Sequence, residues 1–133
     1  MNNILEVLQK NVNKIQDAIS DIDYASSYSN SSASSSYCSY ANSSLGKVVD
    51  ELMSAATNQD NLVNILQNSI SKINSAISDI DYASSYSRSS AVSSYCSYAT
   101  RTLRGVKEEL KSLSSNLDKN KSQSNEEDLE RAQ

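Results

Sequence analysis

Two cysteines and two Asp-Ile-Asp motifs carry the side chains of this chain that could support chemistry. Cys38 and Cys96 are the only cysteines, and the motifs occupy residues 21–23 and 79–81. Residues two apart on a helix point in different directions, so neither motif makes a carboxylate pair for acid–base or calcium chemistry. We therefore expect the four aspartates to be solvated charges.

Serine is abundant, but nothing in the sequence would activate it as a nucleophile. A catalytic triad needs a base beside the serine, and the chain has no histidine and no recognisable Ser/Lys arrangement. Two cysteines without histidine also leave a zinc or copper site short of ligands. We expect no catalytic, cofactor-binding or metal-binding residues, no cofactor and no enzymatic activity.

Both cysteines belong to a stretch that occurs twice. Residues 23–41 read DYASSYSNSSASSSYCSYA and residues 81–99 read DYASSYSRSSAVSSYCSYA. We call these two stretches the Ser/Tyr blocks. They are 58 residues apart and differ only at two pairs of positions, Asn30/Arg88 and Ser34/Val92. An ungapped tandem duplication predicts two equivalent structural units, at about residues 2–58 and 60–116.

Helical periodicity runs through both units. The chain has no proline and only 2 glycines, so little interrupts a helix. Apolar residues recur at alternating steps of four and three, which is typical of a coiled-coil seam. In the first unit they are Ile4, Leu8, Val12, Ile15, Ile19 and Ile22, and a similar series runs from Leu62 to Ile80.

The spacing persists inside the Ser/Tyr blocks, although the residues become small. It reaches Ser29, Ala33 and Tyr37 in the first block and Ser87, Ala91 and Tyr95 in the second. We therefore predict an all-α fold in which two long helices, each passing through one block, form an antiparallel hairpin with coiled-coil packing. The turn between them falls at residues 54–60. Hairpins of this kind would associate into a four-helix bundle or a larger assembly.

An alternative follows from the chemistry of serine. Its hydroxyl competes with the helical backbone for hydrogen bonds, so each Ser/Tyr block could be a loop. Each unit would then be a short helical hairpin, and one chain would form a four-helix bundle by itself.

The long hairpin has consequences for the duplicated residues. In its register Tyr28 faces Tyr86, and the small residues let the two helices approach closely. Cys38 and Cys96 lie tens of ångströms apart along the axis, so they cannot bond to each other. We expect them to be packing residues, with a disulfide between chains as the alternative.

Charge and hydropathy exclude several partners. The net charge is −4 and the pI is about 4.7, which disfavours nucleic acid and anionic membranes. No apolar run is long enough for membrane insertion, and no signal peptide is recognisable. We expect a cytoplasmic protein, with export by another route left open. Residues 117–133 are polar and are expected to be a disordered tail after a hairpin domain at 1–116.

The tyrosines indicate where partners would bind. All 8 aromatic residues are tyrosines of the Ser/Tyr blocks, and a ring that carries a hydroxyl suits a surface that is half buried and half wet. We expect a structural or interaction protein that associates with itself, or with another protein, through these blocks. The expected interaction residues are Tyr24, Tyr28, Ser29, Ala33, Tyr37, Cys38, Tyr40, Tyr82, Tyr86, Ser87, Ala91, Tyr95, Cys96 and Tyr98.

Two other functions fit a small acidic helical chain. Its architecture loosely resembles the helical-hairpin proteins that specialised bacterial secretion systems export, which implies a substrate or an escort of such a system. The Trp-x-Gly turn typical of that family is missing, because the chain has no tryptophan, and no residue roles carry over. The third possibility is an inhibitor that blocks a protein partner with its Tyr/Ser face.

Overall fold

A computed structural model describes the backbone of residues 2–57 and 60–132 and the side chains of residues 4–57 and 60–119. Within these ranges the chain folds into four helices joined by short connections. They are α1 (Asn2–Tyr28), α2 (Ser32–Thr57), α3 (Leu62–Ser85) and α4 (Ser90–Ala132). The predicted all-α class is confirmed.

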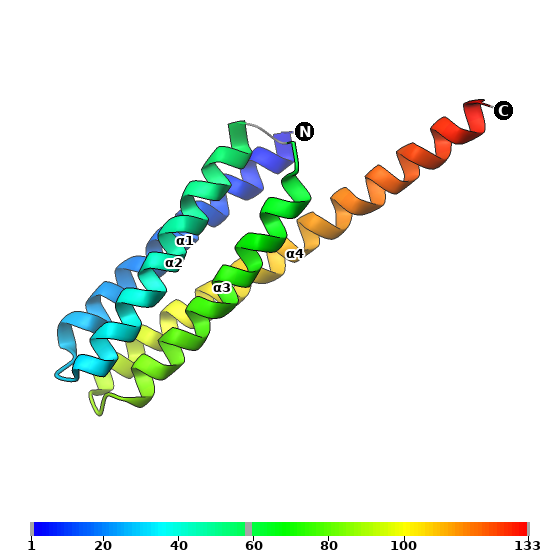
Figure 1. The fold of residues 1–133 in the computed structure, drawn as a ribbon. Helices are drawn as coiled ribbons and strands as arrows, with labels where there is room; N and C mark the ends of the chain where they lie inside the picture. Colours follow the sequence, from blue (N-terminus) through cyan, green and yellow to red (C-terminus); the bar gives the residue numbers. More distant parts are fainter. Residues whose placement is uncertain (1, 58–59, 133) are drawn as a thin grey trace.

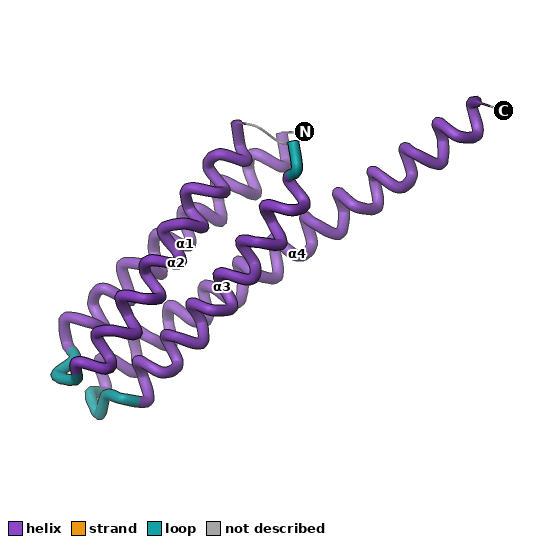
Figure 2. The backbone as a smooth tube through the Cα atoms, in the orientation of Figure 1, coloured by secondary structure: helices purple, strands orange, loops and turns teal. Residues whose placement is uncertain are grey.

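The helices form an up-and-down bundle (Figures 1 and 2). Helix α1 packs against α2 and α4, and α3 packs against the same two helices, so α1 and α3 lie on one diagonal and α2 and α4 on the other. The α1–α2 and α3–α4 loops lie together at one end, which we call the loop end. Helix α4 continues past the opposite end and projects from the bundle.

The prediction of two long helices is wrong, because both Ser/Tyr blocks contain a helix break. Helix α1 ends at Tyr28 and α2 begins at Ser32, whereas α3 ends at Ser85 and α4 begins at Ser90. The alternative arrangement, with four helices bundled within one chain, is the one observed. The turn predicted at residues 54–60 overlaps the connection from α2 to α3, but residues 54–57 are still the end of α2 and residues 58–59 lie outside the described residues.

Serine hydroxyls cause these breaks. The Ser31 backbone N–H donates to Ser29 Oγ at 3.1 Å, and the Ser34 N–H donates to Ser31 Oγ at 3.2 Å. The second of these bonds is an N-cap, which satisfies a backbone donor that the first turn of α2 leaves open. The same two bonds recur 58 residues further on, at 3.2 and 3.4 Å. Local serine bonds therefore outweigh the periodicity that favoured a continuous helix.

The second half of the chain repeats contacts of the first, 58 residues further on. Lys14 of α1 forms an ion pair with Glu109 of α4 at 3.0 Å. The corresponding residues 58 positions away, Lys72 of α3 and Glu51 of α2, form the same pair. The first helix of each unit therefore lies against the second helix of the other unit.

The size of the buried residues changes along the bundle. Away from the loop end the core holds large side chains such as Ile15, Leu52, Ile73 and Leu110, all fully buried. Inside the Ser/Tyr blocks the buried apolar residues are mostly alanine and cysteine. They are Ala25, Cys38, Ala41, Ala83, Val92, Cys96 and Ala99.

The predicted division into a domain at 1–116 and a disordered tail at 117–133 stays a prediction. The backbone of the tail is the end of α4, which is helical through Ala132. Its side chains after residue 119 lie outside the described residues.

Candidate interaction surface

The tyrosines gather near the loop end in two equivalent groups. In the first, which we call patch A, Tyr24 and Tyr28 of α1 lie against Tyr95 of α4, with ring centroids 5.3 and 5.9 Å apart. Tyr98 meets Tyr95 edge-on at 6.0 Å. These separations are those of favourable aromatic pairs. Patch A therefore joins α1 to α4 through four rings.

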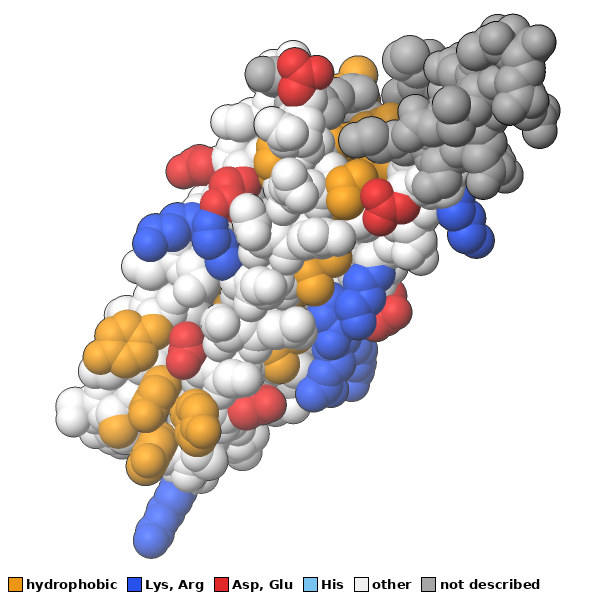
Figure 3. Space-filling view, turned by 45° about the vertical axis from the view of Figure 1, so that its right-hand side comes forward, with side chains coloured by type: hydrophobic (Ala, Val, Ile, Leu, Met, Phe, Trp, Pro, Cys, Tyr) orange, Lys and Arg blue, Asp and Glu red, His pale blue; other side chains and the backbone are white. Residues whose placement is uncertain are grey.

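Patch B repeats this arrangement on the opposite edge of the bundle. Tyr82 and Tyr86 of α3 lie 5.2 and 5.7 Å from Tyr37 of α2, and Tyr40 meets Tyr37 edge-on at 5.8 Å. Because the α1–α4 and α2–α3 edges are opposite, the two patches face away from each other. Figure 3 shows hydrophobic side chains gathered near the loop end on one face of the molecule.

Three rings of each patch are about half exposed. Their exposed fractions lie between 50% and 57%. They are Tyr24, Tyr28 and Tyr98 in patch A, and Tyr40, Tyr82 and Tyr86 in patch B. The central rings, Tyr37 and Tyr95, are partly buried and pack against the core. Each patch is thus an anchored ring with three exposed rings around it, an aromatic surface that folding leaves unburied.

The ring pairs differ from those that the long hairpin predicts. Tyr28 does not face Tyr86, because it stacks on Tyr95 with an interplanar angle of 3°. Tyr86 stacks in the same way on Tyr37, with an angle of 0°. The helix breaks cause the difference, since they fold each block back on itself and bring both blocks to the same end.

The small residues expected at the interaction surface have structural places near it. Ser29 and Ser87 lie in the loops, where their hydroxyls accept the backbone hydrogen bonds that end the helices. Ala33 and Ala91 lie in the first turns of α2 and α4 and are half-buried. These four residues therefore shape the loop end rather than forming a narrow contact between two long helices.

Cys38 and Cys96 meet inside the bundle, so the prediction that they lie far apart is wrong. They are 1% and 3% exposed, are both free, and come from the diagonal helices α2 and α4. Their thiols lie close enough to affect each other's ionisation, and the interaction with Cys38, together with burial, raises the pKa of Cys96.

The aspartates of the two motifs do not form a site. Burial raises the pKa of the Asp21 carboxyl, and repulsion from Asp17 adds to the effect. Burial raises the pKa of Asp79 as well. Asp23 accepts a hydrogen bond from Asn42 Nδ2 at 2.7 Å, which links α1 to α2. Among the described residues no three potential ligands of the Asp, Glu, Cys and His types gather where a metal ion could sit.

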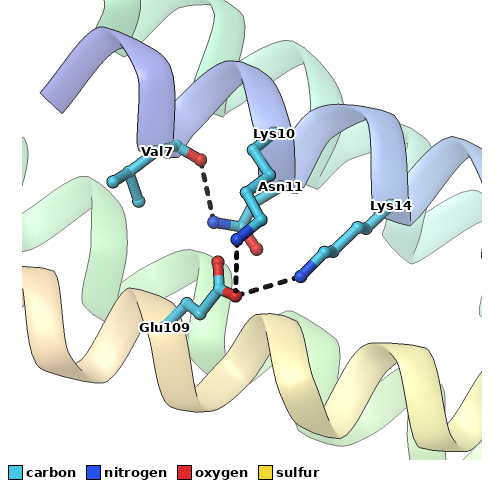
Figure 4. Close-up of polar contacts among 5 residues, drawn as sticks. All are labelled: Val7, Lys10, Asn11, Lys14 and Glu109. Atoms are coloured by element: carbon cyan, nitrogen blue, oxygen red, sulfur yellow. Dashed lines mark hydrogen bonds and ion pairs between the residues drawn. The ribbon is translucent and has the colours of Figure 1, made fainter. Parts of the chain in front are cut away.

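A polar cluster joins α1 to α4 in the half of the bundle away from the patches (Figure 4). Glu109 accepts a hydrogen bond from Lys14 Nζ at 3.0 Å and pairs with Lys10 at 3.4 Å. The buried Asn11 donates to the Val7 carbonyl at 2.8 Å. The Lys14 hydrogen bond, with smaller contributions from Asn11 and Lys10, holds the pKa of Glu109 below its usual value. These contacts fix the positions of α1 and α4 relative to each other.

Comparison with protein-family models, curated protein sequences and solved structures finds no match. None of the described helices has an apolar stretch long enough to cross a bilayer. Function therefore has to be inferred from the geometry of this chain.

Proposed function

We propose that this protein is a non-enzymatic interaction protein that associates with copies of itself through patches A and B. The observation that supports the proposal is the placement of six half-exposed tyrosines in two equivalent patches on opposite edges of the bundle. Tyrosine is enriched and charged residues are depleted at the centre of protein interfaces. A tyrosine ring also gives a large contact area at a low cost in side-chain entropy.

The rings of each patch are already held in place before a partner arrives. In patch A the three exposed rings contact one another through Tyr95, which the core supports from below. A preformed surface loses less conformational freedom on binding than one that must be ordered. Each exposed ring carries a hydroxyl that can bond to water or to a partner, so the patches tolerate exposure in the free chain.

Two equivalent patches give each chain two binding sites. The two patches hold the same four tyrosine positions of the duplicated blocks. A partner surface that binds patch A therefore also binds patch B. Since the patches face away from each other, one chain can bind two neighbours at once. Association of this kind continues beyond a dimer instead of closing.

Size-exclusion chromatography with light scattering on four forms of the chain tests this proposal. The first is the unmodified protein. The second carries Tyr24→Ser, Tyr28→Ser and Tyr98→Ser, which remove the exposed rings of patch A. The third adds the three equivalent changes in patch B. The fourth is a matched control with Met53→Ser, because Met53 is 54% exposed on α2 but lies outside both patches.

The unmodified protein and the Met53 control should show a mass that rises with concentration beyond that of a dimer. The variant without patch A should stop at a dimer, and the variant without either patch should stay a monomer. A monomeric unmodified protein at every concentration would rule out self-association. Assembly of the six-fold variant like the unmodified protein would place the interface elsewhere.

A further inference from the structure

The two buried thiols take no part in the proposed association. Cys38 and Cys96 lie inside the bundle, below the surface that carries the patches, and they occupy the same position of the two units. Burial of a single cysteine would be explained by packing alone. Here two thiols from diagonal helices are neighbours in the core, at equivalent positions of the two units.

A small molecule has a route toward this pair. A surface groove of about 320 Å³ lies between α3 and α4, and Cys96 forms part of its wall together with Ser84, Thr100 and Arg101. The groove is lined largely by polar side chains, which suits a small polar solute. Cys96 itself is 3% exposed, so local opening of the loop end completes the path.

We propose that Cys38 and Cys96 are an oxidation site, in which a hydroperoxide converts the two thiols into a disulfide between α2 and α4. The thiolate of one cysteine attacks one peroxide oxygen, the O–O bond breaks, and the leaving oxygen takes a proton to become water when the oxidant is hydrogen peroxide. The second sulfur then attacks the oxidised one, the S–O bond breaks, and the second oxygen leaves as water with the proton of the second thiol. The two thiols lose two electrons and the peroxide gains them.

One sulfur acts as the nucleophile and the other as the resolving thiol. A thiolate, and not a thiol, is the nucleophile toward peroxide. Both thiols occupy the same position of the two units, so either sulfur can react first, and the other is then the resolving thiol. A resolving cysteine beside the reactive one is the usual arrangement at reversible oxidation sites.

The disulfide would hold the loop end closed. It links residues 58 positions apart, and a cross-link over a loop of that size restricts the unfolded chain strongly. We expect the melting temperature of the oxidised protein to rise by roughly 10 °C. It would also link α2 to α4, the helices that carry the central rings Tyr37 and Tyr95 of the two patches.

The test uses the full, reduced chain treated with hydrogen peroxide. Mass spectrometry and non-reducing electrophoresis should show a monomer that has lost two hydrogen atoms, with the Cys38 and Cys96 peptides joined. Thermal unfolding should shift upward, and a reducing agent should reverse the shift. The Cys38→Ser and Cys96→Ser variants should show neither change, and Cys→Ala variants replace them if circular dichroism shows that a serine variant is unfolded.

Three results would overturn the proposal. One is that both thiols stay unmodified in the folded, peroxide-treated protein. Another is that Cys38 or Cys96 proceeds to a sulfinic acid without a cross-link. The last is that every cross-linked species is a covalent dimer, because the sulfurs would then bond between chains. Each of these results is readable on the unmodified sequence, so the test does not depend on the folding of a variant.

Discussion

The two ends of the bundle differ in where their large side chains lie. They fill the core away from the loop end, and most of them are at the surface near it. Away from the loop end, leucine and isoleucine fill the core, and ion pairs such as Lys14–Glu109 bridge the helices at the surface. In the Ser/Tyr blocks the core is filled mainly by alanine and cysteine, and six of the eight tyrosines are about half exposed. One half thus uses its large apolar side chains for folding, whereas the other leaves most of its aromatic rings at the surface.

The most severe test of this comparison exchanges a large side chain for alanine in each half. Leu103→Ala removes a fully buried side chain and should lower the free energy of unfolding by about 2–5 kcal/mol. Tyr98→Ala removes a ring that is 50% exposed on the same helix and should cost less than about 1 kcal/mol. Urea denaturation followed by circular dichroism, below the concentration of association, measures both. Equal losses would mean that the tyrosines belong to the core.

The loops at the end of the Ser/Tyr blocks offer the next largest effect. Replacing Ser29, Ser31, Ser87 and Ser89 with alanine removes the serine bonds that break the helices. Loss of the two N-caps should lower the free energy of unfolding by about 2 kcal/mol in total. It should also favour continuous helices, so that two chains share a bundle and light scattering reports a dimer without concentration dependence.

The control for this change is the pair Ser36→Ala and Ser94→Ala. Both serines are exposed and lie within α2 and α4, away from the helix starts. Because alanine is the better helix former, the control should be slightly more stable and keep the assembly state of the unmodified chain. If the loop variant and the control behave alike, serine capping does not cause the breaks.

The two blocks differ inside the core at Ser34 and Val92, which gives a smaller effect. Both residues are fully buried, and the Ser34 hydroxyl has no hydrogen-bond partner. Ser34→Val should raise the free energy of unfolding by about 1 kcal/mol, because it removes an unpaired buried polar group and adds apolar contacts. Val92→Ser should lower it by a similar or larger amount. Chemical denaturation that shows the opposite signs would contradict this account of the loop-end core.

The smallest effect concerns the ion pairs of the other half. The pKa of Glu109 is lowered by its contacts, so its contribution to stability is present above the pKa of the unfolded carboxyl and is lost as the pH falls through the folded value. Glu109→Gln should cost about 0.5 kcal/mol at neutral pH, since the pair is partly exposed. It should also flatten the loss of stability on acidification.

Glu108→Gln is the matched control for this prediction. Its side chain is 69% exposed and pairs with Lys111 at 4.0 Å. Denaturation over a series of pH values should leave the control indistinguishable from the unmodified protein. A control that loses as much stability as Glu109→Gln would show that general charge, and not the contact with Lys14, is responsible.

The all-α class could be predicted from the sequence because long-range information was not needed. Absence of proline and an apolar period of three and four residues are local signals, and both hold for the four helices. The positions of the breaks could not be predicted from that period. Helical spacing on both sides of Ser29 and Ser87 is compatible with one helix or two, and the choice depends on whether a serine hydroxyl replaces a backbone bond.

The candidate surface depended on the same choice. The residue types of the patches follow from the duplicated blocks, but the partner of each ring does not. Once the chain folds back at the serine loops, Tyr28 meets Tyr95 instead of Tyr86, and Cys38 meets Cys96. The signal that could have indicated this was the serine at the cap position of each block, Ser31 and Ser89, followed by a helical run.

Sedimentation velocity of the unmodified protein over a wide concentration range tests the central claim most directly. Because the two patches face away from each other, the sedimentation coefficient should rise steadily with concentration past the value of a dimer. A coefficient that stays at the monomer value throughout would contradict the proposal that the exposed tyrosines serve self-association.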